Sequence, residues 1–222
     1  PNSFLFNGAI ENLTKIKSKS SRGISPTVGI AEALFSLSRS IQRQDPYQGI
    51  IWTRLALFIY PDFSFAKLRL ADALTREDNL EQALSIYKSI ARDPNFNRIG
   101  RLRVARTYNF LDKIDQASGV LTAMAKEDKS SIAPLVTLGS MFRGRERYRD
   151  AVNAFNRAKQ RVKSWKKHHW HLLYGNGASL ERLREWPEAE KNFLKALELN
   201  PKEPTVLNYL CLLYTSDAAD DT

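Results

Sequence analysis

The residues best suited to chemistry are three histidines that lie close together in the chain. His168, His169 and His171 are the only histidines of the sequence, and we expect adjacent histidines on a helix to point in different directions. No Cys, Asp or Glu lies near them in sequence to complete a zinc ligand set. No histidine remains elsewhere to activate a serine or cysteine nucleophile. We therefore predict no metal site and no catalytic histidine.

Other patterns that could support catalysis are equally weak. The carboxylate pair Glu77 and Asp78 falls in an expected turn, where acidic side chains are usually solvated. Gly175 and Gly177 belong to a helical pattern and not to a phosphate-binding loop. Cys211 is the single cysteine, so neither an internal disulfide nor a CxxC motif exists. The sequence predicts a chain that is not an enzyme and needs no cofactor, and it leaves open an accessory role beside a catalytic domain encoded elsewhere.

The composition is that of a water-soluble helical or mixed protein with an excess of basic residues. Of the 222 residues, 43% are hydrophobic and 26% are charged, and the formal net charge is +10. No apolar run reaches the ~18 residues of a membrane span. The excess of positive charge favours an acidic protein partner or a nucleic acid. The compartment stays open between the cytoplasm and a bacterial periplasm.

Both ends of the sequence indicate a fragment of a longer protein. The chain begins with Pro1 in place of Met. Residues 211–221, CLLYTSDAADD, resemble a translated sequencing adapter, so we expect 211–222 to be a non-native tail and the native sequence to reach about Leu210. Without three acidic residues of this tail the net charge rises from +10 to +13. These residues are Asp217, Asp220 and Asp221.

Small residues recur along the chain at a nearly constant interval. One set occupies positions 49, 83, 117, 151 and 189, with spacings of 34, 34, 34 and 38 residues. A second set lies upstream of each copy: Ala71, Ala105, Gly139 and Gly177. Large residues follow the first set by four positions at Tyr87, Phe155 and Phe193. We expect pairs of helices whose backbones approach at the small residues and whose large residues fill the layer between neighbouring pairs.

The repeated pattern resembles the tetratricopeptide repeat (TPR) of bacterial proteins. Leu138-Gly139 precedes Phe142 by the expected interval, and Ala189 is followed by Phe193 and by Pro201 after the second helix. The resemblance covers residues 30–210. It implies an all-α fold, a right-handed superhelical solenoid of antiparallel helix pairs, with about five hairpins and the start of another.

Two stretches lie outside the regular repeat. Residues 1–29 are predicted to form an amphipathic helix over 1–20, with Phe4, Ile10, Leu13 and Ile16 on one face, followed by a linker over 20–27. The four extra residues between the last two copies fall in 159–171, which we predict to be an extended helix end followed by a long basic connection.

The resemblance also implies a binding site. In TPR proteins the first helix of each unit lines a concave groove, through its positions 2, 5, 6, 9, 12 and 13. Units counted from Ser64, Arg98, Ile132 and Trp170 place an arginine in every copy. The apolar or small residues taken as facing the groove are Phe65, Leu68 and Phe110, together with Ser179 at the tenth position of the last unit. The peptide-binding candidates are Arg69, Asp72, Arg76, Arg103, Arg106, Asn109, Arg143, Tyr174 and Arg182.

We predict that these arginines form a basic groove that holds an acidic peptide through bidentate guanidinium–carboxylate contacts. The competing interpretation is that arginines on exposed helix faces only keep the chain soluble. The Lys and Asn set with which chaperone-binding relatives clamp a carboxylate does not map onto this sequence. The implied function is a scaffold for a protein or peptide partner.

The basic connection suggests nucleic-acid binding as the alternative. Lysines and arginines there alternate with aromatic residues, as required for phosphate contacts and base stacking. The residues are Arg161, Lys163, Trp165, Lys166, Lys167 and Trp170. The opposing interpretation is a solvated loop whose two tryptophans pack on the adjoining hairpin, and no RNA-binding module motif accompanies the basic residues.

Overall fold

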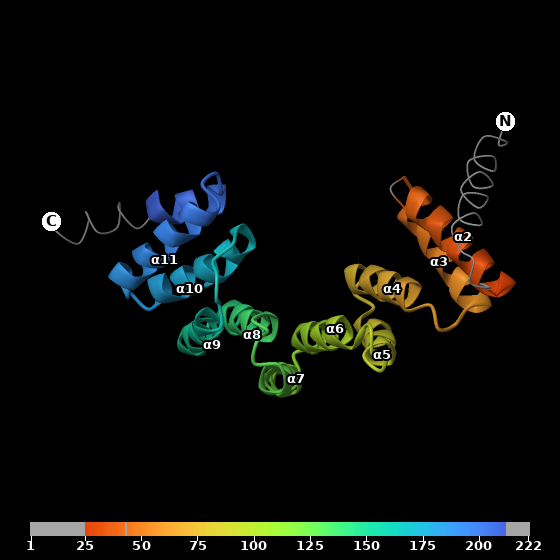
Figure 1. The fold of residues 1–222 in the computed structure, drawn as a ribbon, viewed down its shortest axis with the longest axis horizontal. Coiled ribbons are helices and arrows are strands. Elements are labelled where there is room, and N and C mark those ends of the chain that lie inside the picture. Colours follow the sequence, from red (N-terminus) through yellow and green to blue (C-terminus); the bar gives the residue numbers. More distant parts are fainter. Residues whose placement is uncertain (1–24, 43, 212–222) are drawn as a thin grey trace. The chain divides into compact units, whose positions relative to one another are not determined.

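The computed structural model describes residues 25–42 and 44–211 (Figure 1). Within them the chain is all-α and contains no strand, which confirms the predicted fold class. The predicted helix over 1–20 lies outside the described residues, as does the tail from residue 212 onward. The helices are α2 (Pro26–Ile41), α3 (Pro46–Ile59), α4 (Ser64–Arg76), α5 (Leu80–Ile90), α6 (Asn97–Phe110), α7 (Ile114–Glu127), α8 (Ala133–Gly144), α9 (Tyr148–Gln160), α10 (Trp170–Arg182) and α11 (Trp186–Leu199), with a 3-10 turn η1 (Lys167–His169) before α10. Residues 204–211 are helical as well.

The chain divides into two compact units inside α6. Unit 1 is Pro1–Thr107 and unit 2 is Tyr108–Thr222. In unit 1, α2 packs against α3, α3 against α4, and α4 against α5. In unit 2, α7 packs against α8, α8 against α9, α9 against α10, and α10 against α11. Each unit is therefore a succession of helices that pack on their neighbours in the chain.

The predicted register of the repeat is confirmed. We counted first helices from Ser64, Arg98, Ile132 and Trp170, and the structure begins α4 at Ser64, α6 at Asn97, α8 at Ala133 and α10 at Trp170. Prolines occupy the positions expected of them. Pro187 lies in the first turn of α11, where its missing N–H has no helical partner to lose.

A left-handed residue closes the same turn in four successive hairpins. Asp78, Asp112, Glu146 and Arg184 have φ values of 58–60°. The residue after each donates its backbone N–H to a carbonyl in the last turn of the first helix; Asn79 reaches Leu74 at 2.8 Å and Glu185 reaches Leu180 at 3.0 Å. This hydrogen bond satisfies a carbonyl that the end of the helix would otherwise leave without a partner.

The core of unit 2 is built around phenylalanines that lie against glycines. The fully buried ring of Phe155 on α9 lies where a Cβ on Gly139 of α8 or on Gly175 of α10 would stand, 2.7 Å from either. Phe193 of α11 lies in the same way against Gly177 of α10. The large residues fill the layer between helices, as predicted. The glycines meet aromatic rings, however, and not the backbone of a facing alanine as we expected.

Close backbone approach does occur in unit 1. A Cβ on Gly100 of α6 would lie 2.7 Å from the backbone nitrogen of Ala91, directly after α5. Tyr87 of α5 is 1% exposed and fills the space beside α4. Gly100 does not belong to either set of small residues that the repeat predicted.

The extra residues between the last two hairpins lie entirely in the connection. α9 ends at Gln160, nine residues after its small residue Ala151, whereas α7 and α11 each end ten residues after theirs. The predicted extension of the helix end is therefore wrong. Residues 161–166 and η1 form the connection, which then enters α10.

Candidate functional site

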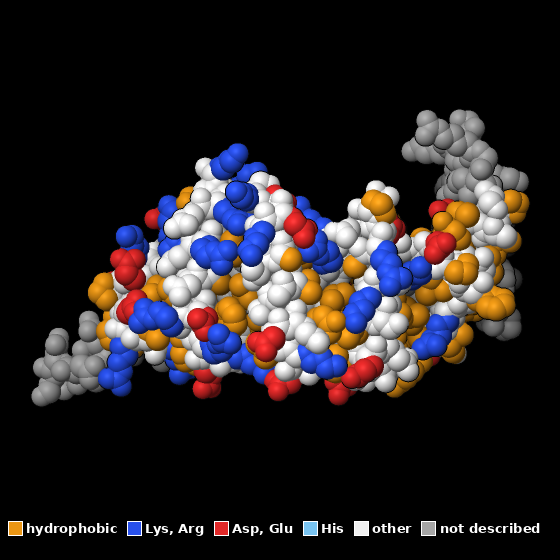
Figure 2. All heavy atoms as spheres, turned by 90° about the horizontal axis from the view of Figure 1, so that it is seen from below, with side chains coloured by type: hydrophobic (Ala, Val, Ile, Leu, Met, Phe, Trp, Pro, Cys, Tyr) orange, Lys and Arg blue, Asp and Glu red, His pale blue; other side chains and the backbone are white. Residues whose placement is uncertain are grey.

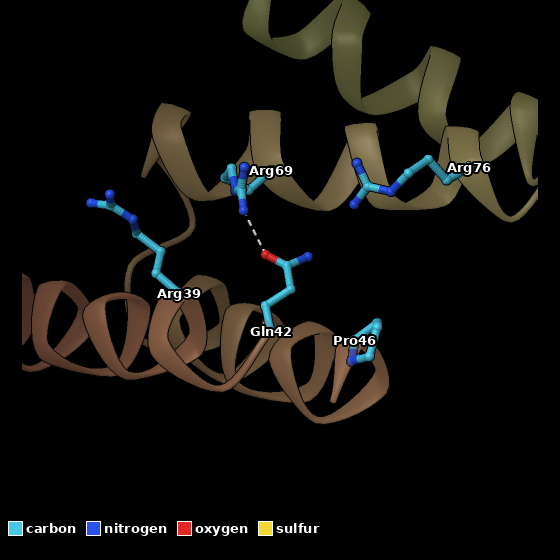
Figure 3. Close-up of a pocket in the computed structure, with 5 residues that line it drawn as sticks. All are labelled: Arg39, Gln42, Pro46, Arg69 and Arg76. Atoms are coloured by element: carbon cyan, nitrogen blue, oxygen red, sulfur yellow. Dashed lines mark hydrogen bonds between the residues drawn. The ribbon is translucent and has the colours of Figure 1, made fainter. Parts of the chain in front are cut away.

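Unit 1 contains a pocket whose charged lining is entirely basic. It has a volume of about 460 Å³ and is lined by Arg39 and Gln42 at the end of α2, Pro46 at the start of α3, and Arg69 and Arg76 on α4. Figure 3 shows Gln42 and Arg69 pointing toward each other across it, from facing helices. The Arg69 Nη2 atom donates to the Gln42 Oε1 atom at 2.6 Å, which holds the guanidinium in place and leaves its charge uncompensated.

The structure positions both predicted arginines of α4 in this pocket. Arg69 and Arg76 lie seven residues apart, so two helical turns bring them to the same side of α4. Both side chains are exposed, as is Arg39. Guanidinium groups keep their charge at every physiological pH and present several donors in one plane. The pocket is suited to carboxylate or phosphate oxygens.

Asp72 and Arg103 are engaged with each other. The Arg103 Nε atom lies 2.9 Å from the Asp72 Oδ1 atom, and its Nη2 atom donates to Oδ2 at 3.4 Å. The Tyr87 hydroxyl donates to the same carboxylate at 2.6 Å. Burial, together with the hydrogen bond to Asp72, raises the pKa of Tyr87 to about 12, so this donor stays protonated. Because its charge is compensated inside the protein, Arg103 is a poor candidate for holding an acidic ligand.

Asn109 is likewise committed to an internal contact, in unit 2. Its Oδ1 atom accepts from Arg145 Nε at 3.3 Å, and its backbone carbonyl accepts from Arg145 Nη2 at 2.7 Å. Arg145 also forms an ion pair with Asp112 in the turn before α7. Arg106 is exposed on α6. Asn109 therefore binds a neighbouring arginine of the chain and is not offered to a ligand.

The remaining candidates form a small aromatic site in unit 2. The Arg143 guanidinium of α8 lies 5.7 Å from the centroid of the Tyr174 ring on α10, and the Tyr174 ring meets that of Tyr209 edge-on at 5.6 Å. Burial and the neighbouring Tyr209 raise the pKa of Tyr174. The Arg143 Nε atom is buried without a hydrogen-bond partner. This arrangement can hold a cation-π contact, worth about 0.5–2 kcal/mol.

Two other predicted groove residues of α10 do not join this aromatic site. Arg182 is exposed, and its Nε atom lies 3.5 Å from the carboxylate of its neighbour Glu181. Ser179 is fully buried, and its hydroxyl donates to the backbone carbonyl of Gly175. The prediction that Ser179 faces a ligand is therefore wrong.

The basic connection is more firmly bound to the fold than its composition indicates. The Arg161 guanidinium donates to three backbone carbonyls: Ala125 at 2.9 Å, Ser131 at 2.9 Å and Asp128 at 3.1 Å. It therefore closes the end of α7 and is not free for phosphate. Trp165 and Trp170 are partly buried against the core of unit 2, as the solvated-loop interpretation expects.

The histidines sit beside these tryptophans. His168 and His169 lie in η1 with ring centroids 4.1 Å apart, so our expectation that adjacent histidines point apart is wrong, because this turn is not an α-helix. His171 lies against Trp170. Burial lowers the pKa of His169, whose Nδ1 atom accepts from the Lys166 N–H at 3.0 Å. Over residues 25–42 and 44–211, no group of three or more His, Cys, Asp and Glu side chains is placed to hold a metal ion.

Figure 2 shows the distribution of charge on one face of the molecule. Several Lys and Arg side chains gather in the upper part of this face, and elsewhere on it basic side chains lie among acidic and apolar ones. Within the part of the chain that the structure describes, no helix is both long and apolar enough to cross a bilayer. In the arginine pocket of unit 1, three guanidinium groups converge without a lining carboxylate.

Sequence reasoning missed part of this pocket. Counting one period upstream of Ser64 starts a unit at Ile30, and its thirteenth position is Gln42, a lining residue. Arg39 is the tenth position of that unit, outside the groove pattern. The groove positions were counted only from Ser64 onward because the first copy of the repeat is degenerate, although the 34-residue interval would have located Gln42.

The fold has relatives of known structure, whereas no protein-family model and no curated protein match the sequence. PilW, a type IV pilus biogenesis factor, superposes with a TM-score of 0.65 at 15% identity, over 81% of this chain and 82% of its own. YrrB, a TPR protein with an unusual peptide-binding site, superposes with a TM-score of 0.55 at 14% identity, over 89% of this chain and 96% of its own. Cut9, solved in the APC/C hetero-tetramer Cut9-Hcn1, superposes with a TM-score of 0.61 at 17% identity over 95% of this chain. This chain spans about half of the Cut9 structure, 47% of its length.

Proposed function

Because the chain has the tetratricopeptide-repeat fold, we propose that it is an interaction scaffold that binds a protein or peptide segment. The fold supports this proposal, since proteins of this kind are associated with binding and YrrB has a peptide-binding site. The chemistry of the segment follows from the arginine pocket. We propose that an Asp or Glu side chain of the partner enters the pocket between Arg39, Arg69 and Arg76.

The observation that supports this best is the convergence of three guanidinium groups around a cavity with no carboxylate in its lining. Among the other candidate arginines, Arg103 is already paired with Asp72 and Arg182 lies beside Glu181. Charge-assisted hydrogen bonds from arginine to carboxylate are shorter and stronger than neutral ones. Exposed charges are screened by salt, so the affinity of the pocket for an acidic residue should fall as the salt concentration rises.

Binding of a fluorescent oligo-glutamate peptide tests the pocket. Replacing Arg69 and Arg76 with Ala removes two donors and is expected to weaken binding about tenfold or more, since each charge-assisted hydrogen bond is worth about 1.5–3 kcal/mol when well formed. The matched control replaces Arg54 and Arg92, two exposed arginines of unit 1 outside the pocket. It changes the net charge by the same amount. Equal weakening by both pairs would show that only net charge attracts the peptide.

Nucleic-acid binding by the basic connection is the second candidate, favoured by the exposure of Lys163, Lys166 and Lys167 along one short segment. Affinity for a single-stranded oligonucleotide would then fall steeply and linearly on a log–log plot against salt. It would also fall when Lys166 and Lys167 are replaced with Ala. If the affinity for DNA or RNA changed neither with salt nor on replacement of Lys166 and Lys167, this segment would be excluded as the nucleic-acid contact.

A further inference from the structure

α3 exposes a row of large apolar side chains to solvent. Tyr47, Ile51, Leu55 and Phe58 are 74%, 57%, 41% and 84% exposed. They recur every three or four residues and therefore share one side of the helix. The opposite side of α3 is buried and carries the small residues Gly49, Thr53 and Ala56. We call these four residues the α3 apolar face.

The equivalent positions of every other second helix lack large apolar residues, which makes this face unusual within the chain. One repeat interval at a time, Tyr47 corresponds to Glu81, Asp115, Arg149 and Pro187. Ile51 corresponds to Ser85, Gly119, Asn153 and Lys191, and Phe58 to Arg92, Lys126, Gln160 and Glu198. All twelve are exposed. The same position in the fold thus faces water in four copies and carries aromatic or branched apolar residues only in the first, as expected of a surface that is covered.

We infer that the α3 apolar face is the docking site for the segment that precedes α2, residues 1–24 of this chain. Those residues lie outside the described structure, and their sequence supplies the complementary surface. Ile10, Leu13 and Ile16 recur at intervals of three, the spacing that gathers side chains on one side of a helix. The first copy is also the one that this segment adjoins in the chain.

The distances allow this docking. The α3 apolar face runs over the twelve residues from Tyr47 to Phe58, or roughly 17 Å of helix at 1.5 Å per residue. A helix from Phe4 to Ile16 would be of similar length. The nine residues between Ile16 and Pro26 can span up to about 30 Å when extended. The segment can therefore reach either end of α3, which packs directly against α2.

Photo-crosslinking in the full chain tests the docking. p-Benzoylphenylalanine replaces Phe58, whose high exposure makes the substitution easy to accommodate. A matched chain carries it in place of Lys126, the equivalent position on α7. Irradiation of a dilute sample followed by peptide mapping is expected to join position 58 to residues 1–24 within one molecule, and to give no such product from position 126. Replacing Leu13 and Ile16 with Asp should lower the yield from position 58 about tenfold or more.

Each contrary outcome identifies the error. A crosslink between two molecules, whose yield rises with protein concentration, would assign the α3 apolar face to a second copy of the chain and overturn the proposal. Absence of any product with residues 1–24, or a yield that the Leu13→Asp and Ile16→Asp changes leave intact, would overturn it as well. Because the pocket arginines do not take part, the result is independent of the peptide-binding proposal.

Discussion

Phe155 offers the sharpest test of how the helices of unit 2 are held together. Its ring is fully buried and lies between Gly139 of α8 and Gly175 of α10, 2.7 Å from the place of a Cβ on each. Truncation to Ala would remove the ring from a site where neither glycine has a side chain that could move into the space. A Phe→Ala change in a core costs about 3–5 kcal/mol, and we expect the upper half of that range.

Urea unfolding followed by tryptophan fluorescence measures the effect, since three of the four tryptophans lie in unit 2. Helical repeats can unfold in stages, so the slope m must stay unchanged for the comparison to hold. Phe110→Ala is the control, because its side chain is 58% exposed and its loss should cost no more than about 0.5 kcal/mol. A loss below about 1.5 kcal/mol for Phe155→Ala would refute the role assigned to the ring.

A double-mutant cycle then tests whether ring and glycine depend on each other. Gly139→Ala alone should destabilise by about 1–3 kcal/mol, because the new methyl overlaps the ring of Phe155. In a Phe155→Leu background the smaller side chain leaves room for the methyl, so most of this cost should vanish. The expected coupling is about 1–3 kcal/mol. Additivity within about 0.5 kcal/mol would show that the two residues act independently.

Three further predictions concern two helical glycines, Arg161 and His169. Gly119→Ala, where a Cβ would meet open space, should stabilise α7 by about 0.5–1 kcal/mol in thermal unfolding, whereas Gly100→Ala, where it would meet backbone, should destabilise. Arg161→Ala should cost about 1–3 kcal/mol in urea unfolding because three carbonyls lose their donor, and the exposed Lys163→Ala should cost almost nothing. The lowered pKa of His169 means that the unfolded chain binds its proton more tightly, so stability is retained above pH ~6.5 and lost on acidification below it. Replacing His169 with Asn should remove that part of the pH dependence of unfolding.

The hairpin register was predictable from sequence because it depends on volume alone. Only a residue without a bulky side chain fits where Phe155 lies against α8 and α10, so Gly139 and Gly175 had to be small. Gly177 meets the ring of Phe193 in the same way. The interval between the small residues located the starts of α4 and α10 to the residue. What could not be predicted was the partner of each small residue, because a glycine beside a ring and a glycine beside a backbone look alike in sequence.

The arginine pocket was only half predictable for a related reason. The position of Arg69 on α4 follows from the repeat, but the pocket also needs α2 and the start of α3, which belong to a copy whose motif has eroded. Arg39 was therefore not predicted, because groove positions were counted only in copies with a recognisable motif. The α3 apolar face escaped for the opposite reason: an apolar residue in a helix is expected to be buried, and only the comparison with the other copies marks Phe58 as exceptional.

Whether an arginine is available to a partner depends on whether an acidic residue about one repeat away in the sequence already pairs with it. In a stack of similar hairpins, the side chain beside a given residue belongs to the equivalent part of the next copy, so partners are separated by about one period. The internal pairs bear this out: Arg103 lies 31 residues from Asp72, Arg145 lies 33 from Asp112, and Arg149 lies 36 from Glu185. An acid at that distance in the sequence is therefore a candidate partner for an arginine. By the same criterion Arg69 has no acid from 31 to 36 residues before it or after it. It lines the pocket with its charge available, which is the property that binding an acidic segment requires.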